Sequence, residues 1–398
     1  MTTAALNASP APAQTWTDKK RYFWMLGFTV MLLPYTGANL AQATGLSIFY
    51  WFAPLFIYTA IPLLDWLIGT DASNPPEAAV AGLERDAYYR YIVYVAVGIE
   101  FAMFLWGFQL IATGDLSLFA RLGVAISIGG ITGVSINTAH ELGHKTDGFE
   151  RWLARITLAP VAYGHFFVEH NRGHHVRVAT PEDPASSRFG ESFYEFLPRT
   201  VFGSVASAWE IEKKRLARLG HGPIHWRNEN LQAWSMTVVF YGVLLTWLGW
   251  IILPFLLIQA VYGFSLLESV NYLEHYGLCR QKTADGRYER CQPHHSWNSN
   301  HVVTNLFLYQ LQRHSDHHAF PTRSYQSLRH FEDCPQLPSG YASMILLAYF
   351  PPLWFRLMDP KVIAHYKGDM RLANIKPSIR ERVIAQVRPA QSPEPTPA

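Results

Sequence analysis

Long uncharged stretches alternate with polar ones along this chain. The first apolar stretch starts at Tyr22, directly after three basic residues, and is divided near Gly45. A helix needs about 20 predominantly apolar residues to cross the hydrocarbon core of a bilayer. Each apolar stretch of that length is therefore predicted to be a transmembrane helix. Six segments meet this criterion: 22–41, 46–68, 91–112, 118–138, 233–250 and 251–272.

The polar stretches predict how the rest of the chain is organised. Residues 140–232 and 273–376 are expected to form a helical cap on one side of the six transmembrane helices. Together with those helices they make 21–376 a single all-α domain embedded in a membrane. The segment 341–358 is apolar but is interrupted by a Pro-Pro pair. It is therefore expected to lie on the membrane or to pack against the domain instead of spanning.

The two ends of the chain have a different composition. Residues 1–20 begin with an Ala- and Pro-rich stretch that lacks the basic start of a signal peptide, so a disordered N-terminal tail is expected. Residues 377–398 end in VRPAQSPEPTPA, and prolines at this density are typical of extended linkers. This segment is predicted to be a C-terminal tail or a linker to a further domain.

Basic residues predict the orientation of the helices. Lys and Arg concentrate before the first predicted span, in the loop after the second and across 140–234, whereas the turns 41–45, 113–117 and 249–254 contain none. Because basic loops stay on the cytoplasmic side, both termini and the whole cap are predicted to be cytoplasmic. The net charge is only +3, which gives no reason to expect a nucleic acid partner.

Histidines gather in four short segments on the predicted cytoplasmic side. HELGH and HNRGHH follow the fourth predicted span, NYLEHYG closes the sixth, and LQRHSDHHA lies further along. In the last of these, the spacing i, i+3, i+4 puts three imidazoles on one face of a helix. In HNRGHH the two adjacent histidines point to different sides of a helix. The four segments supply nine candidate metal ligands: His140, His144, His170, His174, His175, His275, His314, His317 and His318.

Nine imidazoles suit two metal ions, because one ion takes about four to six ligands. All-nitrogen ligation favours Fe, Zn, Cu or Ni over Mg or Ca. Ligand imidazoles also need polar partners on their far side, which fix the tautomer and raise the basicity of the bound nitrogen. The candidates for that supporting role lie beside the histidines: Glu141, Glu169, Asp183, Asn271, Glu274 and Asp316.

HELGH alone is also the signature of zinc proteases, in which two histidines bind zinc and a glutamate, here Glu141, is the general base. Such an enzyme needs one further protein ligand, which leaves six of the nine histidines without a role. An intramembrane zinc metalloprotease is therefore the less favoured alternative, and Glu141 is predicted to support the ligands and not to act as a hydrolytic base. A non-catalytic metal carrier is favoured least.

Longer motifs around the histidines carry a family resemblance. HELGHK (140–145), EHNRGHH with the following VATPEDPASS (169–187), NYLEHYGL (271–278) and LQRHSDHHAFPTRSYQSL (311–328) resemble the membrane alkane 1-monooxygenases. These belong to the integral-membrane non-haem di-iron desaturases and hydroxylases. The similarity runs from about Asp18 to Lys376. In one detail the chain departs from the general desaturase pattern HxxHH, because its second box reads HxxxHH.

The resemblance implies an activity and a cofactor. It implies terminal hydroxylation of medium-chain n-alkanes to 1-alkanols, with two non-haem iron ions held by the histidines, O2 as co-substrate and the alkane entering from the bilayer. It also implies rubredoxin, separate or fused at the C-terminus, as the electron donor. No residue pattern for haem, flavin or an iron–sulfur cluster is present, and the three cysteines form no CxxC.

Two further expectations follow from the same resemblance. The protein is expected in the inner (cytoplasmic) membrane of a bacterium, with the histidine boxes on the cytoplasmic face. The main alternative activity is that of a membrane fatty-acyl or lipid desaturase or hydroxylase, which would use the same metals. Product analysis with octane and a fatty-acyl substrate separates the two activities.

Overall fold

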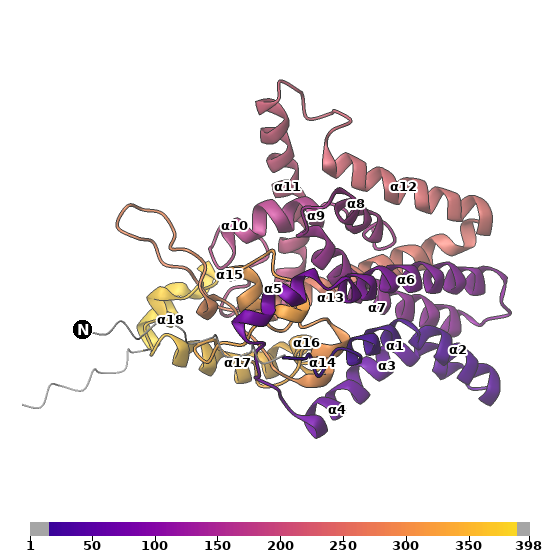
Figure 1. Ribbon diagram of the computed structural model, residues 1–398, viewed down its shortest axis with the longest axis horizontal. Coiled ribbons are helices and arrows are strands. Elements are labelled where there is room, and N and C mark those ends of the chain that lie inside the picture. Colours follow the sequence, from indigo (N-terminus) through magenta and orange to yellow (C-terminus); the bar gives the residue numbers. More distant parts are fainter. Residues whose placement is uncertain (1–15, 388–398) are drawn as a thin grey trace, which may run out of the picture.

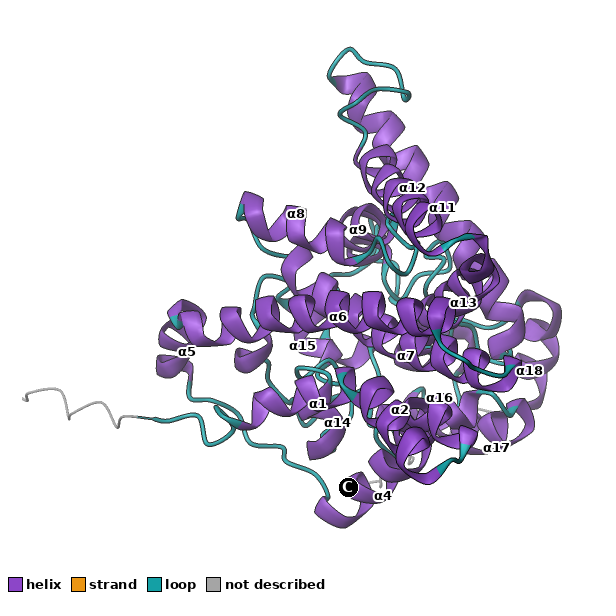
Figure 2. Cartoon of the chain, turned by 90° about the vertical axis from the view of Figure 1, so that its right-hand side faces the viewer, coloured by secondary structure: helices purple, strands orange, loops and turns teal. Residues whose placement is uncertain are grey.

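The computed structural model describes residues 16–387, so 1–15 of the predicted N-terminal tail and 388–398 of the predicted linker lie outside the described residues. Within the described range the chain is helical, and its β-structure consists of isolated bridges (Figure 1). The prediction of an all-α fold is confirmed. Figure 2 shows the same helices from the side, joined by loops of varied length.

Helices long and apolar enough to cross a membrane account for five of the six predicted spans, which makes the chain a membrane protein. Each lies at or close to its predicted position, and α6, α7 and α13 run side by side in Figures 1 and 2. The five stretches are Ser47–Ile68 (η2, α3, η3 and α4 in succession), α6 (Ala87–Thr113), α7 (Leu118–Gly143), α12 (Glu229–Leu248) and Trp250–His275 (η5 and α13).

The first predicted span, 22–41, does not form one long helix, so this one of the six predicted spans is not confirmed. The segment is divided into η1 (Phe23–Leu26), α1 (Gly27–Met31) and α2 (Leu33–Thr44). Pro34 occupies the first turn of α2, and because proline has no backbone N–H it cannot continue the hydrogen-bond ladder from α1. The segment is apolar enough to be predicted as a membrane span, but the proline interrupts the helix.

The two helices that carry histidines at their ends, α7 and α13, are packed backbone to backbone. A Cβ atom at Gly129 of α7 would lie 2.7 Å from the carbonyl oxygen of Gln259 in α13, and one at Gly133 would lie 2.9 Å from that of Gly263. Only glycine permits this approach, as in other close pairs of membrane helices. The close packing holds the HELGH end of α7 beside the His275 end of α13.

Shorter helices form the remainder of the domain. Those that carry or surround the histidine boxes are α8 (Gly148–Thr157), α9 (Phe166–Glu169), the π-helix η4 (His170–His174), α10 (His175–Arg177), α11 (Phe193–Arg218), α14 (Val302–Phe307) and α15 (His314–Ala319). The others are α5 (Glu77–Arg85), η6 (Pro293–His295), η7 (Tyr325–Ser327), α16 (Tyr341–Ala348), α17 (Pro351–His365), η8 (Met370–Leu372), η9 (Pro377–Ile379) and α18 (Arg380–Gln386).

The apolar segment 341–358 forms α16 and most of α17, and it packs into the domain. Tyr341, Trp354 and Met358 are buried in one hydrophobic cluster with Tyr272 and Tyr276 at the end of α13. Further on, α18 falls inside the segment predicted as a C-terminal tail, and Val383 of that helix joins the same cluster. The first part of that segment is therefore helical and packs against the domain.

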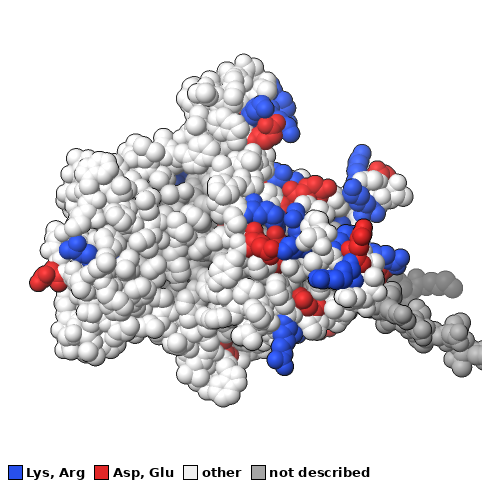
Figure 3. Space-filling model, turned by 180° about the vertical axis from the view of Figure 1, so that it is seen from behind, with Lys and Arg blue, Asp and Glu red and all other residues white. Residues whose placement is uncertain are grey.

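Charged side chains gather at one end of the molecule, whereas the opposite end is almost entirely uncharged (Figure 3). The charged end is the left-hand side of Figure 1, where α10, α15 and α18 lie. The five long apolar helices extend from this end toward the uncharged one. The fold therefore separates a polar end that carries the histidine boxes from an apolar end suited to hydrocarbon.

Candidate metal centre

The structure brings all nine predicted histidines together, in two groups. In each group the ligand nitrogens lie within 4.8 Å of one another. Four segments far apart in the sequence supply them. Seven of the nine residues are buried, His275 completely, and His144 and His175 are half-buried. The larger group is His140, His144, His170, His175 and His317, and the smaller is His174, His275, His314 and His318.

The second box is divided between the two groups by the π-helix η4. In a π-helix the hydrogen bonds run from i to i+5, so His170 and His175 lie on the same side, with their Nε2 atoms 2.9 Å apart. His174 points to the other group, where its Nε2 atom lies 3.3 Å from the Nε2 atom of His318. The expectation that His174 and His175 face different sides is thus met. The wide turn also accommodates the extra residue of HxxxHH.

The helix α15 serves both groups as well. His314 and His318 are one turn apart, with their Nε2 atoms 2.8 Å from each other. His317 turns toward the larger group, where its Nε2 lies 2.8 Å from that of His140 and 3.1 Å from that of His175. One six-residue helix therefore contributes ligands on both sides.

The chemistry of these nitrogens fits metal ions. A neutral imidazole carries one N–H and one lone pair, and burial lowers the pKa of His170, His175 and His317 well below the usual value, so these rings are neutral at pH 7. Neither ring nitrogen of the buried His275 has a hydrogen-bond partner among the described residues. Nitrogen ligands of metal ions are expected to show both features: lone pairs that converge on one point, and buried imidazoles without a hydrogen-bond partner in the protein.

Two of the predicted supporting carboxylates contact imidazoles directly. Asp183 Oδ2 accepts a 2.9 Å hydrogen bond from Nδ1 of His174, which leaves Nε2 of that ring to point into its group. Glu274 Oε2 lies 3.0 Å from Nε2 of His314, and its Oε1 accepts a 2.6 Å hydrogen bond from the Tyr341 hydroxyl. The Asp183 contact is on the nitrogen that faces away from the group, and carboxylate–histidine pairs of this kind orient ligand rings. Glu274 instead places a carboxylate oxygen beside Nε2 of His314, the nitrogen that faces the smaller group.

The other predicted supporting residues make their hydrogen bonds and ion pairs elsewhere. Glu141 pairs with Lys145 at 2.7 Å. Glu169 accepts from Arg177 at 2.6 Å. Asp316 accepts from Arg323 at 2.8 Å and from the backbone N–H of Arg329. Asn271 donates to Glu268 at 3.2 Å. Among the described residues none of these four side chains hydrogen-bonds an imidazole.

Sequence reasoning did not find Tyr341. This residue begins an apolar segment in which an aromatic side chain is normally a packing residue, and its contact with Glu274 depends on where α16 docks. No local pattern in the sequence distinguishes its hydroxyl from that of the other tyrosines.

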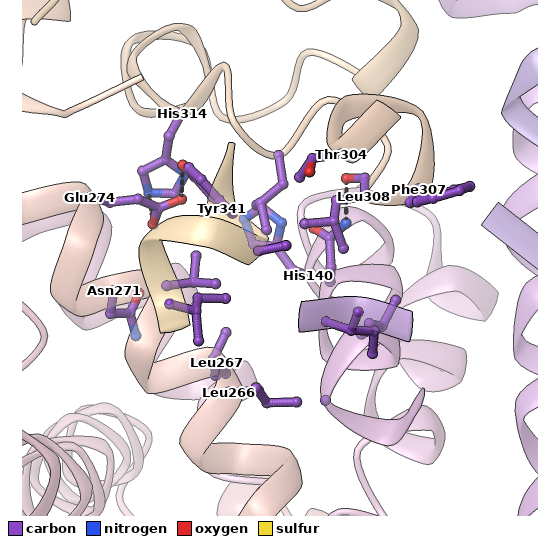
Figure 4. A pocket seen from close by; sticks show the side chains of 18 of the residues that line it. His140, Leu266, Leu267, Asn271, Glu274, Thr304, Phe307, Leu308, His314 and Tyr341 are labelled. Atoms are coloured by element: carbon purple, nitrogen blue, oxygen red, sulfur yellow. Dashed lines mark hydrogen bonds and ion pairs between the residues drawn. The ribbon is translucent and has the colours of Figure 1, made fainter. Parts of the chain in front are cut away.

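An apolar cavity ends at the histidines (Figure 4). It is lined at that end by His140, His170 and His314, with Glu274 and Tyr341 beside them. Away from the histidines the walls are aliphatic and aromatic side chains of several helices, among them Val30, Ile57, Ile61, Val134, Leu266 and Phe307. An elongated hydrocarbon in this cavity would have one end next to the nitrogen ligands.

Known proteins place the chain in a family of enzymes. The model of the fatty acid desaturase family matches residues 116–348, which contain all nine histidines. The chain therefore belongs to this family.

Its relatives define the branch within that family. Alkane 1-monooxygenase of Ectopseudomonas oleovorans is 49% identical over 373 residues, covering 94% of this chain and 93% of that protein. Alkane 1-monooxygenase of Acinetobacter baylyi is 48% identical over 375 residues, with coverage of 93% and 91%. The hydroxylase component of the xylene/toluene monooxygenase of Pseudomonas putida is 28% identical over 291 residues, with coverage of 71% and 75%. The chain is thus an oxidoreductase of the alkane 1-monooxygenase branch, and the resemblance found in its motifs is confirmed.

Proposed function

We propose that this enzyme hydroxylates the terminal carbon of medium-chain n-alkanes to 1-alkanols, using O2 and two non-haem iron ions held by the nine histidines. The observation that carries the proposal is the apolar cavity that ends on both histidine groups, in a chain whose relatives are alkane 1-monooxygenases. When bound, the iron would supply the activation of O2 and the oxidation of the C–H bond.

The residues of the chain bind and orient the metal ions. Five imidazoles would hold one ion and four the other. Asp183 fixes the Nδ1–H tautomer of His174, and the Tyr341 hydroxyl holds Glu274 in place against His314. Because both carboxylates are buried, they have no water to exchange with. The His174 ring is thereby held in one orientation, and the Glu274 carboxylate stays beside the ligand nitrogen of His314.

The cavity binds the alkane and excludes water from the site. Its walls present apolar side chains from α1, α4, α7, α13 and α14. A hydrocarbon that enters from water therefore gains free energy on binding, and one that enters from the bilayer passes into a similarly apolar environment. Entry from the bilayer is consistent with walls that come from membrane-crossing helices. A dry cavity also limits side reactions of a strong oxidant with water.

Two observations favour iron-dependent hydroxylation over the zinc protease. A catalytic zinc keeps about three protein ligands and one open position, whereas the groups here offer five and four nitrogens. In addition, Glu141 is paired with Lys145 at 2.7 Å, so its carboxylate is not free to accept a proton from a metal-bound water.

A fatty-acyl or lipid desaturase remains the second candidate function, because the matching family model is named for fatty acid desaturases. The identities of 48% and 49% to alkane 1-monooxygenases over nearly the full chain favour the alkane. A substrate without a polar head group also agrees with the apolar lining of the cavity.

For the electron donor we propose an acidic rubredoxin that docks at the charged end of the molecule. Three arginines and one carboxylate line a cleft there, so that its charged lining is basic on balance: Arg188, Arg380, Arg382 and Glu381. Within residues 16–387 no carboxylate lies at ion-pair distance from Arg188 or Arg382. Pro181 also lines the cleft, and Asp183, two residues further on, contacts His174. For the location we propose the cytoplasmic membrane of a bacterium, with the charged end in the cytoplasm.

The test uses the purified protein in lipid, with rubredoxin, its reductase and NADH. Iron analysis should give two ions per chain, and incubation with octane and with a fatty-acyl substrate should yield 1-octanol and no desaturated or hydroxylated lipid. Zinc in place of iron, or products from the fatty-acyl substrate alone, would contradict the proposal.

A further inference from the structure

A buried carboxyl group of α13, that of Glu268, has no role in the site described so far. The residue is 1% exposed and lies about two turns before His275. Its Oε1 accepts a hydrogen bond of 2.7 Å from the Tyr163 hydroxyl. Its Oε2 accepts from Thr200 Oγ1 at 2.8 Å and from the Asn271 amide at 3.2 Å. Three neutral donors from three segments therefore surround one carboxyl group.

This arrangement is costly if its purpose is only structural. No lysine, arginine or histidine within residues 16–387 forms an ion pair with Glu268, and a buried carboxylate without a counter-charge is destabilising. A glutamine could connect the same helices with neutral hydrogen bonds at lower cost. Ionisable side chains in membrane helices usually mark functional positions such as proton relays.

Glu268 lines the smaller of two adjoining cavities. A small one, of about 10 Å³, is lined by Glu268, Tyr163, Ser204 and the two histidines His170 and His174. That volume is of the order that one water molecule needs, about 10–15 Å³. The small cavity shares three wall residues with the large apolar cavity: Phe166, His170 and Asn271. Asn271, which donates to Glu268, faces both cavities and is labelled in Figure 4.

The small cavity also leads toward the surface. Glu169 forms part of its wall, and Glu169 Oε1 accepts from Arg177, whose side chain is 31% exposed. The same guanidinium donates to Ser207 of α11 at 2.6 Å. Polar groups therefore line a continuous route from the exposed Arg177, through the small cavity, to Glu268 and Asn271. The large cavity, in contrast, is walled by apolar side chains.

We propose that Glu268 is a proton-transfer residue that passes protons from the small polar cavity toward the oxygen-reducing end of the large one. The inference rests on the proposed function. Insertion of one oxygen atom of O2 into a C–H bond releases the other as water: R–H + O2 + 2 e⁻ + 2 H⁺ gives R–OH + H2O. The electrons come from rubredoxin, and the two protons must reach a site that is closed by imidazoles and hydrocarbon.

In this arrangement the Glu268 carboxyl accepts a proton from the small cavity and releases it on the side of Asn271. Tyr163 and Thr200 hold the carboxyl group at the wall of the small cavity, so that neither oxygen turns into the apolar wall. Proton entry is thereby kept apart from the hydrocarbon, which occupies the large cavity. Within the described residues no hydrogen bond joins Glu268 to a metal ligand. Its role is therefore to transfer protons along this polar route and not to hold the metal ions.

The decisive variant is Glu268→Gln, which retains size and hydrogen bonding but cannot transfer a proton. We expect it to fold, to hold the wild-type amount of iron and to lose about 100-fold in octane turnover, the lower end of the range for general acid–base groups. Its solvent deuterium isotope effect on turnover should exceed that of the wild type, because proton delivery becomes slower. Glu268→Asp should recover most of the turnover.

The matched control is Gln259→Met, at a buried polar residue of the same helix that bonds Thr132 and the carbonyl of Pro160. It should lower thermal stability but leave the isotope effect unchanged.

Wild-type turnover in Glu268→Gln, or a loss of turnover with an unchanged isotope effect, would overturn the inference. If Glu268→Gln lost iron, Tyr163→Phe would decide: it keeps the carboxyl group, and an unchanged isotope effect there would overturn the inference. Absence of 1-octanol from the wild type would instead contradict the proposed function.

Discussion

Asp183 Oδ2 lies 2.9 Å from Nδ1 of His174 and at the same time accepts a 2.6 Å hydrogen bond from the Ser186 hydroxyl. Its Oδ1 accepts a 3.2 Å hydrogen bond from the backbone N–H of Ala185. Both oxygens of this buried carboxylate are therefore held within a loop that continues directly to the cleft lined by Arg188. The contact joins the ligand His174 to the charged end of the molecule. It decides which nitrogen of His174 faces the smaller histidine group.

Asp183→Ala is therefore expected to weaken iron binding. Without the carboxylate the His174 ring loses its fixed tautomer and part of its basicity, and loss of such a partner typically costs about 10- to 100-fold in metal affinity. The measurement is iron retained per chain during titration with a chelator. Asp285→Ala, at an exposed residue of the 283–287 turn, is the matched control and should behave as wild type. Equal iron retention in both variants would refute the orienting role of Asp183.

The ion pair of Glu141 with Lys145 gives a second prediction. Glu141→Gln should retain iron and at least part of the alkane turnover, since the carboxylate contacts Lys145 and no imidazole, and the amide oxygen of glutamine can still accept a hydrogen bond from that lysine. Wild-type protein should show no peptidase activity. Peptide cleavage by the wild type that disappears in Glu141→Gln would support the zinc protease instead.

The glycine contact between α7 and α13 gives a third prediction. Gly129→Val should separate the two helices, because its Cβ would lie 2.7 Å from the backbone oxygen of Gln259, and overpacking of this kind costs about 1–3 kcal/mol. Since HELGH and His275 lie at the ends of these helices, iron content should fall together with thermal stability. Gly98→Val is the control, because a Cβ at Gly98 of α6 meets no atom within 4 Å. Normal iron content in Gly129→Val would show that the packing does not position the ligands.

The nine histidines could be predicted from the sequence because their spacing and their position at the ends of apolar segments are local features. Their division into five and four could only partly be predicted. The opposite directions of His174 and His175 follow from adjacency, but the pairing of His170 with His175 depends on the π-helix, whose wide turn has no signature in HNRGHH. The pairing of Glu274 with Tyr341 depends on the docking of α16, which brings together residues 67 positions apart.

The membrane helices, too, could be predicted only in part from the sequence. Composition and length identified five long helices correctly, since a hydrophobic stretch is sufficient to predict a span. The first stretch met the same criterion, yet it is divided where Pro34 follows α1. The apolar cavity could not be predicted at all. Its walls combine Val30, Ile57, Leu266 and Phe307 from four separate segments, and only the packed fold brings those side chains to one place.

The arginine cleft gives the last prediction, which concerns the electron donor. Burial and the neighbouring Arg199 lower the pKa of Arg188, yet an arginine keeps its charge at neutral pH. A positively charged cleft beside the Asp183 loop is complementary to an acidic rubredoxin. The double variant Arg188→Glu/Arg382→Glu should raise the KM for rubredoxin about 10-fold or more, since each ion pair contributes up to about 1 kcal/mol and the reversal adds repulsion. Turnover at saturating donor should change little, because donor affinity and not the iron site is altered.

Salt should weaken wild-type turnover below saturation, since exposed charges are screened within about 8–10 Å at physiological ionic strength. Lys213→Glu, on the exposed part of α11, is the control and should leave the KM unchanged. A wild-type KM in the double variant, or equal KM changes in the control, would exclude this cleft as the docking site.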